Sequence, residues 1–375
     1  MIYFDNAATG GFKPSSVIDT ACSVIKYLNA NTGRSGHRLS KTASDYVYSC
    51  RKRLCEFFGA TTPARVIFTK NCTEALNVAI HGAITKGKVL TSTLEHNSVL
   101  RPLFTLKERG IITLCVIEPE NKRFITVKDI EKYYDNEVTA VCLNAVSNVT
   151  GEGAEIDKIG EFLKDKNCLF IVDGAQCAGH EKLNICEQHI DMLAVAGHKG
   201  LYSIQGVGAL VLSERANPNS VYQGGTGSES FNTLQPDCYP EKLESGTLNL
   251  PAICSLEEGV KYAEKNMPYQ STILNSYTDY LIKGLNKISG VTVYSNPNGY
   301  GIVSFKINGV SSLDASEILS SKYDIAVRGG FHCAPLIHKM LRTDNDGLVR
   351  ASICTHNTKR ELNALLFAVK EISEF

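Results

Sequence analysis

The sequence lacks the features that mark several large classes of protein. Its 39 lysines and arginines are balanced by 39 aspartates and glutamates, so no overall charge favours nucleic acid or an anionic membrane as a partner. No apolar stretch approaches the length needed to span a bilayer, and the opening residues MIYFDNAATG show no basic segment followed by an apolar one. We therefore expect no secretory signal, no membrane partner and no nucleic-acid partner.

The cysteines are numerous but do not form a recognisable ligand pattern. Thirteen are present, and no two of them make a C-x-x-C pair, which argues against a zinc ribbon or a thioredoxin-like motif. Several, such as Cys142 and Cys168, lie inside apolar stretches, where a reduced cysteine packs as a small hydrophobic side chain. A reducing compartment, the cytoplasm, is therefore the expected location.

The sequence does contain short apolar runs that end in polar residues. Three of them predict buried strands, at residues 170–172, 192–196 and 207–212. Strand ends line the ligand crevice of an open α/β sheet, so we expect four polar residues near these ends to share one pocket: Asp173, Gln176, His198 and Lys199. A lysine beside a buried carboxylate suits pyridoxal phosphate, which links to a lysine amine and keeps its ring nitrogen protonated against an aspartate. The simpler alternative is a turn aspartate and a solvated loop lysine.

The segments Asp173-Gly174-Ala175-Gln176 and Gly197-His198-Lys199 resemble the class V aminotransferase branch of fold-type I pyridoxal-phosphate enzymes. Within that branch the chain is similar to the cysteine desulfurases and selenocysteine lyases. The resemblance extends from Asn6-Ala7-Ala8 to Arg350-Ala351-Ser352. It implies an α/β fold with two domains: a large domain (15–255) with a mainly parallel, seven-stranded sheet containing one reversed strand, and a small α+β domain (1–14 and 256–375).

The resemblance also implies a set of cofactor-binding residues. Lys199 carries the cofactor, Asp173 holds its ring nitrogen, and His96 stacks on its ring. The start of the helix that follows residue 71 suits the phosphate, because free backbone N–H groups bind anions there; for Thr73, a helix cap is the plainer alternative. The remaining implied contacts are made by Cys72, Thr73, Asn148, Gln176, His198 and, from a neighbouring subunit, Thr247.

Substrate contacts follow from the same resemblance. Ala7 belongs to a segment at the substrate mouth, and Asn148 faces the substrate as well as the cofactor. His37 lies in a glycine-rich loop, residues 31–37, that approaches the active site; an ordinary surface connection is the alternative. Arg350 matches the arginine that grips the substrate α-carboxylate, a task that suits guanidinium because it makes two parallel hydrogen bonds. Its alternative is a surface ion pair.

Cys333 is the predicted nucleophile. It lies on a turn after Gly329-Gly330, beside His332 and near Arg328, so its thiol is expected to be exposed and electropositive. A zinc set of His332 and His338 lacks other suitably spaced ligands, so no metal is expected. The segment resembles the Arg-x-Gly-x-His-Cys motif of the second group of desulfurases. This similarity implies that Lys199 takes the Cα proton and that Cys333 keeps the substrate sulfur as a persulfide while alanine leaves.

Three positions depart from the family pattern: Ala196, Lys242 and Pro335. The implied substrate is L-cysteine or selenocysteine, the implied assembly is a homodimer, and a protein is the implied sulfur acceptor. A selenocysteine lyase or selenium-delivery enzyme is the nearest alternative. An aminotransferase or epimerase, in which Cys333 is incidental, and a non-catalytic scaffold of the same fold are the others.

Overall fold

The computed structural model describes residues 1–33 and 35–374, and its centre is a seven-stranded sheet. The strand order is β2-β8-β7-β6-β5-β3-β4, and β8 runs antiparallel to both of its neighbours while the other pairs are parallel. The predicted mainly parallel sheet with one reversed strand is confirmed. Its strands are β2 (Val66–Thr69), β3 (Lys88–Ser92), β4 (Thr113–Ile117), β5 (Val138–Asn144), β6 (Leu169–Asp173), β7 (Met192–Ala196) and β8 (Gly208–Leu212).

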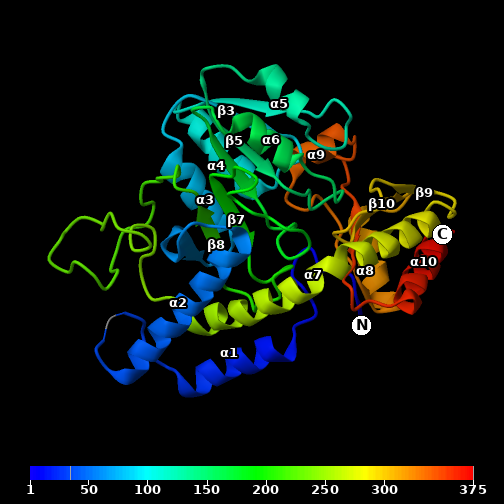
Figure 1. The fold of residues 1–375 in the computed structure, drawn as a ribbon. Helices are drawn as coiled ribbons and strands as arrows, with labels where there is room; N and C mark the ends of the chain where they lie inside the picture. Colours follow the sequence, from blue (N-terminus) through cyan, green and yellow to red (C-terminus); the bar gives the residue numbers. More distant parts are fainter. Residues whose placement is uncertain (34, 375) are drawn as a thin grey trace.

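Helices cover both faces of this sheet, because its strands are apolar on both sides. In β5, Val141 and Leu143 join one hydrophobic core, whereas Ala140 and Cys142 join the other, as expected when side chains alternate along a buried strand. The second core is shared with α3 (Cys72–Ala83) and α4 (Asn97–Glu108), and Figure 1 shows the resulting layers. The first is shared with α1 (Ser15–Tyr27), α2 (Arg38–Phe58), α6 (Ile156–Leu163) and α7 (Leu250–Leu285). The short α5 (Val127–Tyr133) and a 3₁₀ turn, Pro63–Arg65, complete this part.

The long helix α7 differs from the sequence-based expectation. Apolar residues at helical spacing in 251–266 and 271–288 predict two separate helices, but the structure has one helix of 36 residues that continues through Pro268. A proline removes one intrahelical hydrogen bond, and the remaining bonds and the packing of α7 against α1 and α2 maintain the helix. The expected boundary between residues 255 and 256 therefore falls inside α7, which runs through both parts of the chain (Figure 1).

The C-terminal part holds a small antiparallel sheet of β9 (Val291–Val293), β10 (Ile302–Ile307) and β12 (Val349–Ser352). The N-terminal strand β1 (Ile2–Tyr3) pairs in parallel with β11 (Ile325–Ala326), so both ends of the chain lie in this part (Figure 1). That pairing brings Asp5 beside Ser352, two residues from Arg350, which is predicted to bind the substrate α-carboxylate. The helices of this part are α8 (Ser312–Tyr323) and α10 (Lys359–Ser373), whereas α9 (Pro335–Met340) packs into the first core of the large sheet through Ile337.

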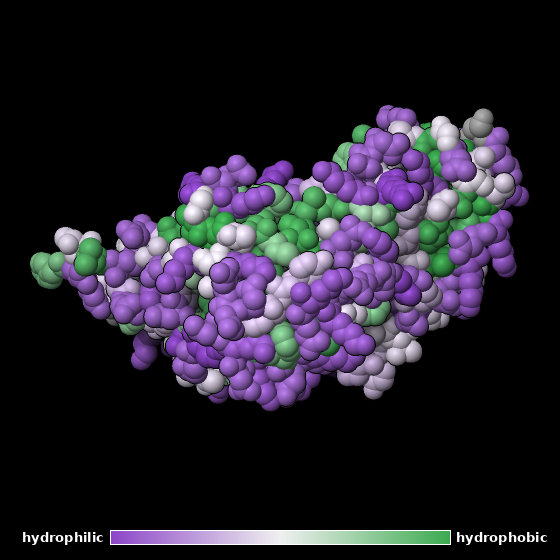
Figure 2. Space-filling view, turned by 90° about the horizontal axis from the view of Figure 1, so that it is seen from above, coloured by the Kyte–Doolittle hydropathy of each residue, from purple (hydrophilic) through white to green (hydrophobic). Residues whose placement is uncertain are grey.

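The surface is mostly hydrophilic on the face shown in Figure 2, with an apolar band along it and an apolar tip at one end. In Figure 1 a long loop protrudes at the same end, between β8 and α7, and two of its apolar side chains are exposed: Phe231 and Leu234. None of the helices formed by residues 1–33 and 35–374 is both long enough and apolar enough to cross a bilayer.

Candidate active site

A cavity of about 80 Å³ lies at the carboxyl ends of the central strands. It collects eight of the nine residues predicted to hold the cofactor: Cys72, Thr73, His96, Asn148, Asp173, Gln176, His198 and Lys199. A second, smaller cavity shares Gln176 and Lys199 and is also lined by Asn6, Ala7 and Cys354. The sequence located the pocket because parallel strands deliver their C-terminal residues to one edge.

Lys199 follows β7 and reaches both cavities. Burial lowers the pKa of its amine, because a low-dielectric setting disfavours the charged form; the nearby Asp173 carboxylate opposes this shift. A lysine with a lowered pKa holds more of its neutral, nucleophilic form. The solvated loop lysine considered from the sequence is therefore excluded.

Asp173 ends β6 and is held from two sides. Its Oδ1 accepts a hydrogen bond from the backbone N–H of Ala175 at 2.9 Å, and the buried thiol of Cys72 contacts the same oxygen at 3.4 Å. Burial and the Asp173 carboxylate raise the pKa of Cys72 well above its ordinary value, so the thiol stays protonated and donates. Cys72 thus supports the carboxylate directly, a contact that the sequence reasoning did not foresee.

At the start of α3 the backbone N–H groups of Cys72 and Thr73 have no partner within residues 1–33 and 35–374, so they can bind an anion. Asn71 caps the helix by accepting from the N–H of Glu74 at 2.9 Å, so Thr73 is not the cap. Instead, the Thr73 hydroxyl shares a hydrogen bond of 2.8 Å with the Ser98 hydroxyl at the start of α4. The starts of α3 and α4 therefore meet at this cavity. The α3 start favours negative charge, whereas the first N–H groups of α4 already donate to His96 and to the Cys333 carbonyl.

His96 lies immediately before α4 and caps it. Its Nδ1 accepts from the backbone N–H of Ser98 at 3.0 Å and lies 2.8 Å from the Ser98 hydroxyl. Burial lowers the pKa of His96 to about 4, and the positive charge of Lys199 adds to the effect, while Asp173 opposes it. The ring is therefore neutral at pH 7, with Nδ1 fixed as an acceptor.

His198 precedes Lys199 and is tied to the N-terminal segment. Its Nδ1 lies 3.1 Å from the Thr9 hydroxyl, and its carbonyl accepts from the Lys13 amine at 3.0 Å. Burial, with the charges of Lys199 and Lys13, lowers the pKa of His198 to about 4. The same N-terminal segment receives a hydrogen bond from Gln176, whose Nε2 donates to the carbonyl of Ala7 at 3.0 Å.

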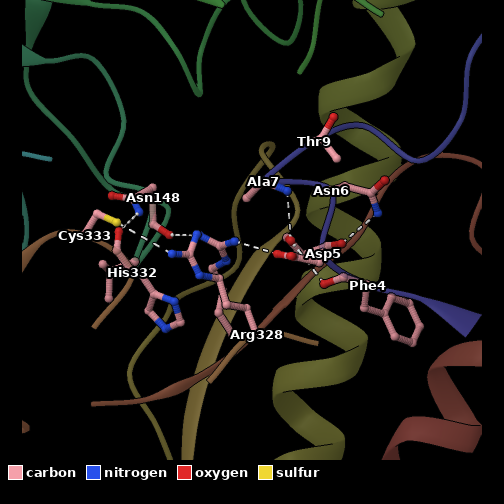
Figure 3. A network of polar contacts seen from close by, with 12 residues as sticks. Phe4, Asp5, Asn6, Ala7, Thr9, Asn148, Arg328, His332 and Cys333 are labelled. Atoms are coloured by element: carbon pink, nitrogen blue, oxygen red, sulfur yellow. Dashed lines mark hydrogen bonds and ion pairs between the residues drawn. The ribbon is translucent and has the colours of Figure 1, made fainter. Parts of the chain in front are cut away.

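Asn148 joins the cavity to the two elements expected to act on substrate (Figure 3). Its side-chain Nδ2 donates to the carbonyl of His332 at 2.7 Å, and its own carbonyl accepts from Arg350 Nη1 at 3.1 Å. Its amide oxygen, Oδ1, is buried and has no partner within the described part of the chain. The side chain of Asn148 thus fixes the loop that carries Cys333, and the backbone of Asn148 fixes the guanidinium of Arg350.

Arg350 lies within β12 and is almost completely buried, with 1% of its surface exposed. Its Nη2 pairs with Asp5 Oδ1 at 2.7 Å. Burial lowers the pKa of Arg350, and the Asp5 carboxylate opposes that shift. Arg350 is therefore not a surface ion pair, which was its alternative from the sequence.

Cys333 lies on an exposed turn beside Arg328. The guanidinium Nη2 of Arg328 is 3.6 Å from the thiol sulfur, so the electropositive setting expected from the sequence is present. Both His332 and Cys333 adopt left-handed backbone conformations, with φ of 50° and 58°. The turn is tied to the cofactor cavity through Asn97, which follows His96 and donates its N–H to the carbonyl of Cys333 at 2.7 Å.

Two predicted residues lie away from this cavity. Thr247 is exposed and lines a separate cavity of about 700 Å³ with Lys70 and Tyr222. His37 is exposed and caps α2 by accepting from the N–H of Ser40 at 3.2 Å. Within this chain neither residue reaches Lys199; Arg34, in the same predicted loop as His37, lies outside the described residues.

Sequence reasoning missed several residues that the structure places at the site: Asp5, Lys13, Ser98 and the thiol contact of Cys72. Asp5 stands directly before the Asn6-Ala7-Ala8 segment, at the end of a short apolar run, which is the same signal that identified Asp173. In the described part of the chain, no group of three or more histidine, cysteine, aspartate or glutamate side chains is arranged to hold a metal ion.

The cavity fits pyridoxal phosphate. It offers a buried amine with a lowered pKa at Lys199, a buried carboxylate at Asp173, helix-start donors for a phosphate and an unpartnered acceptor at Asn148 Oδ1. Lys199 would link to the cofactor, Asp173 would hold its ring nitrogen, and Thr73 and Ser98 would lie near its phosphate. When bound, the cofactor supplies an electron sink for bonds at the substrate Cα.

Comparisons with known proteins identify the family of this chain. The family model of the aminotransferase class-V family matches residues 2–365. A probable cysteine desulfurase of Methanothermobacter thermautotrophicus is 30% identical over 99% of this chain and 94% of its own length. The apo structure of a cysteine desulfurase from Thermococcus onnurineus superimposes with a TM-score of 0.90, 31% identity and coverage of 100% of this chain and 94% of that one. An Escherichia coli cysteine desulfurase, at 23% identity and a TM-score of 0.89 over 99% of this chain and 94% of its own, shares the fold. The chain belongs to the class-V aminotransferase family.

Proposed function

We propose that this protein is a pyridoxal-phosphate-dependent cysteine desulfurase that takes sulfur from L-cysteine onto the thiol of Cys333. The observation that carries the proposal is the placement of this exposed thiol. It lies 3.6 Å from Arg328, and its turn is fastened by Asn148 and Asn97 to the cavity that holds Lys199. The similarity of the whole chain to cysteine desulfurases supports the same reaction.

The residues around the cavity divide the work of binding and proton transfer. Arg350 binds the α-carboxylate of the substrate by charge-assisted hydrogen bonds. Lys199, whose pKa is lowered by burial, accepts the Cα proton and returns a proton to product. The neutral ring of His96 covers the cavity without adding charge. Buried Asp173 supplies the negative charge that a ring nitrogen needs to remain protonated.

Cys333 performs the sulfur transfer. Its thiolate attacks the substrate sulfur, an S–S bond forms, and the bond from that sulfur to the substrate Cβ breaks. Cβ is protonated, so cysteine and the enzyme thiol become alanine and a persulfide on Cys333, with no external oxidant or reductant. Arg328 favours this attack because its charge, 3.6 Å from the sulfur, stabilises the negative charge on the attacking atom.

A protein thiol is the proposed sulfur acceptor, because Cys333 is exposed to an approaching macromolecule. The proposed assembly is a homodimer in which Thr247 completes the neighbouring site. Two observations support this arrangement. Thr247 is exposed and lines a cavity separate from that of Lys199. The protruding loop between β8 and α7 also exposes Phe231 and Leu234. Thirteen free cysteines support a reducing compartment, the cytoplasm.

The test is incubation of the holoenzyme with L-cysteine and, separately, L-selenocysteine, with alanine and sulfide or selenide quantified. Cysteine should yield alanine and, with a thiol reductant, an equal amount of sulfide. Cys333→Ala should lose this activity and keep the cofactor, whereas the exposed control Cys186→Ala should keep both. Full cysteine activity in Cys333→Ala contradicts the proposal. Turnover of selenocysteine alone would identify a selenocysteine lyase.

Complementation tests the role of Thr247 in the dimer. Lys199→Ala and Thr247→Ala should each be inactive alone. Co-expressed, they should regain part of the activity, because a mixed dimer has one site with an intact Lys199 and the partner's Thr247. A mixture that stays inactive, although mixed dimers are isolated, contradicts this arrangement.

A further inference from the structure

We propose that Asp5 is the resting counter-ion of Arg350, and that its carboxylate occupies the guanidinium until a substrate carboxylate displaces it. This inference rests on the proposed role of Arg350 in substrate binding. It assigns to the N-terminal segment a direct part in setting the affinity for amino acids.

Asp5 is the more exposed partner of its pair with Arg350. Arg350 has 1% of its side chain exposed, whereas Asp5 retains 23%, and the two are joined by the 2.7 Å contact between Nη2 and Oδ1. Neither cavity that reaches Lys199 is lined by Arg350, although one of them is lined by Asn6 and Ala7, the neighbours of Asp5. Asp5 is thus the solvent-accessible partner of the pair, and it directly precedes residues that line a cavity containing Lys199.

The charges around Arg350 prevent the Asp5 carboxylate and a substrate carboxylate from pairing with its guanidinium at the same time. A buried guanidinium without a counter-ion is strongly unfavourable, so the free enzyme needs Asp5 in place. A second carboxylate beside the same guanidinium would lie close to the Asp5 carboxylate, and this contact between like charges is unfavourable. Binding is therefore an exchange of one carboxylate for another, not a simple addition.

The backbone around Asp5 permits this exchange without unfolding the segment. The carbonyl of Asp5 accepts from the N–H groups of Ala8 and Thr9 at 3.1 and 3.3 Å, and also from the Tyr3 hydroxyl at 3.2 Å. In contrast, the Asp5 carboxylate has no hydrogen-bond partner besides Arg350 within residues 1–33 and 35–374. Rotation of one side chain thus frees the guanidinium while the main chain stays fixed.

Arg350 also retains donors for the incoming group. Nη1 donates to the carbonyl of Asn148, and Nε is buried without a partner in the described part of the chain. The Asp5 contact uses Nη2 alone. A substrate carboxylate that gains two parallel bonds therefore replaces a single one, which gives the exchange its direction.

The experiment measures binding of L-alanine, the proposed product, to the holoenzyme by calorimetry. Asp5→Asn keeps the shape of the side chain and removes the competing charge, so L-alanine should bind roughly tenfold more tightly, the effect of losing one charge-assisted hydrogen bond from the free state. The control Asp324→Asn neutralises an exposed aspartate that pairs with the N-terminal amine, and should leave the affinity unchanged. Unchanged or weaker binding in Asp5→Asn overturns the inference.

A crystal structure of the unaltered holoenzyme with L-alanine provides a second test that needs no variant. The Asp5 carboxylate should have left Arg350, and a persisting Nη2–Oδ1 hydrogen bond beside a bound carboxylate overturns the inference. Arg350→Gln separates the two proposals. If it still binds L-alanine with full affinity, the proposed role of Arg350 fails. If Arg350→Gln loses L-alanine binding but Asp5→Asn does not bind L-alanine more tightly, only the inference about Asp5 fails.

Discussion

Arg328 and Arg350 face each other across a short antiparallel bridge, in which each donates its N–H to the carbonyl of the other at 3.1 and 2.8 Å. From this bridge the two side chains reach different parts of the proposed active site. Arg328 reaches the sulfur of Cys333, and Arg350 reaches the proposed carboxylate site beside Asn148. The distance between nucleophile and carboxylate clamp is thus set by main-chain hydrogen bonds.

Replacement of Arg328 by Gln should slow the reaction of Cys333 with iodoacetamide several-fold at neutral pH, because the variant loses the charge that lies beside the attacking sulfur and stabilises it. Sulfide production from L-cysteine should fall in parallel. The rates are measured across a pH range by counting alkylated Cys333 with mass spectrometry. The matched control is Lys339→Gln, an exposed cation in α9, which should change neither rate. Equal alkylation rates in Arg328→Gln and the unaltered protein argue against this role.

Replacement of Cys72 by Ala should destabilise the protein by about 1–2 kcal/mol, because it removes a buried donor to Asp173 and leaves a small cavity. Cys72→Ser restores a hydroxyl donor and should recover part of the loss. Urea unfolding of both variants, with the cofactor removed, gives the free energies of unfolding. If Ser is no better than Ala, the thiol contributes packing and not a hydrogen bond.

Replacement of Glu244 by Gln should lower the free energy of unfolding by about 3–5 kcal/mol, since it leaves the Arg51 guanidinium buried without its counter-ion. The pair is bidentate, at 2.7 and 2.9 Å, and both side chains are under 10% exposed. Glu244 stands three residues before Thr247, so the proposed dimer contact should weaken as well. Lys283→Ala, which breaks an exposed ion pair with Asp279, should change the stability by less than about 0.5 kcal/mol.

The denaturant midpoint of Glu244→Gln measures the loss of stability, and its sedimentation coefficient measures the weakening of the proposed dimer. A Glu244→Gln variant as stable as Lys283→Ala would show that the buried pair contributes little.

Stability should fall as the pH is lowered from about 6.5 toward 4, through the buried histidines. Burial lowers the pKa of His96, His180 and His198 to about 4 in the folded protein, against 6.5 as the ordinary value. In this window the unfolded chain binds protons that the folded chain does not, so protonation favours unfolding; the stability is fully present above 6.5.

Urea unfolding at a series of pH values measures the slope. His180→Asn removes one of these groups without changing Lys199, and should reduce the slope by at most about 1.4 kcal/mol per pH unit. An unchanged slope in that variant contradicts the assignment of His180 to the acid transition.

Much of the site could be predicted because its residues follow recognisable strands. Asp173 and Lys199 each end a short apolar run, and parallel strands bring such ends to one edge of the sheet. The exposed setting of Cys333 could be read from Gly329-Gly330 and the nearby arginine. By contrast, the extra contact of Cys72 with Asp173 and the continuous helix α7 were not predicted, because packing decides them and local pattern does not.

The sequence by itself determined three of the central strands, the pocket at the strand ends and the type of chemistry that its lysine, aspartate and cysteine support. These follow from periodicity and residue type, which are local properties. Only the tertiary structure decided that Asp5 pairs with Arg350, 345 residues away, and that Arg350 is buried. The physical reason is that charge pairing and desolvation depend on which surfaces meet after folding, and no local pattern contains that information.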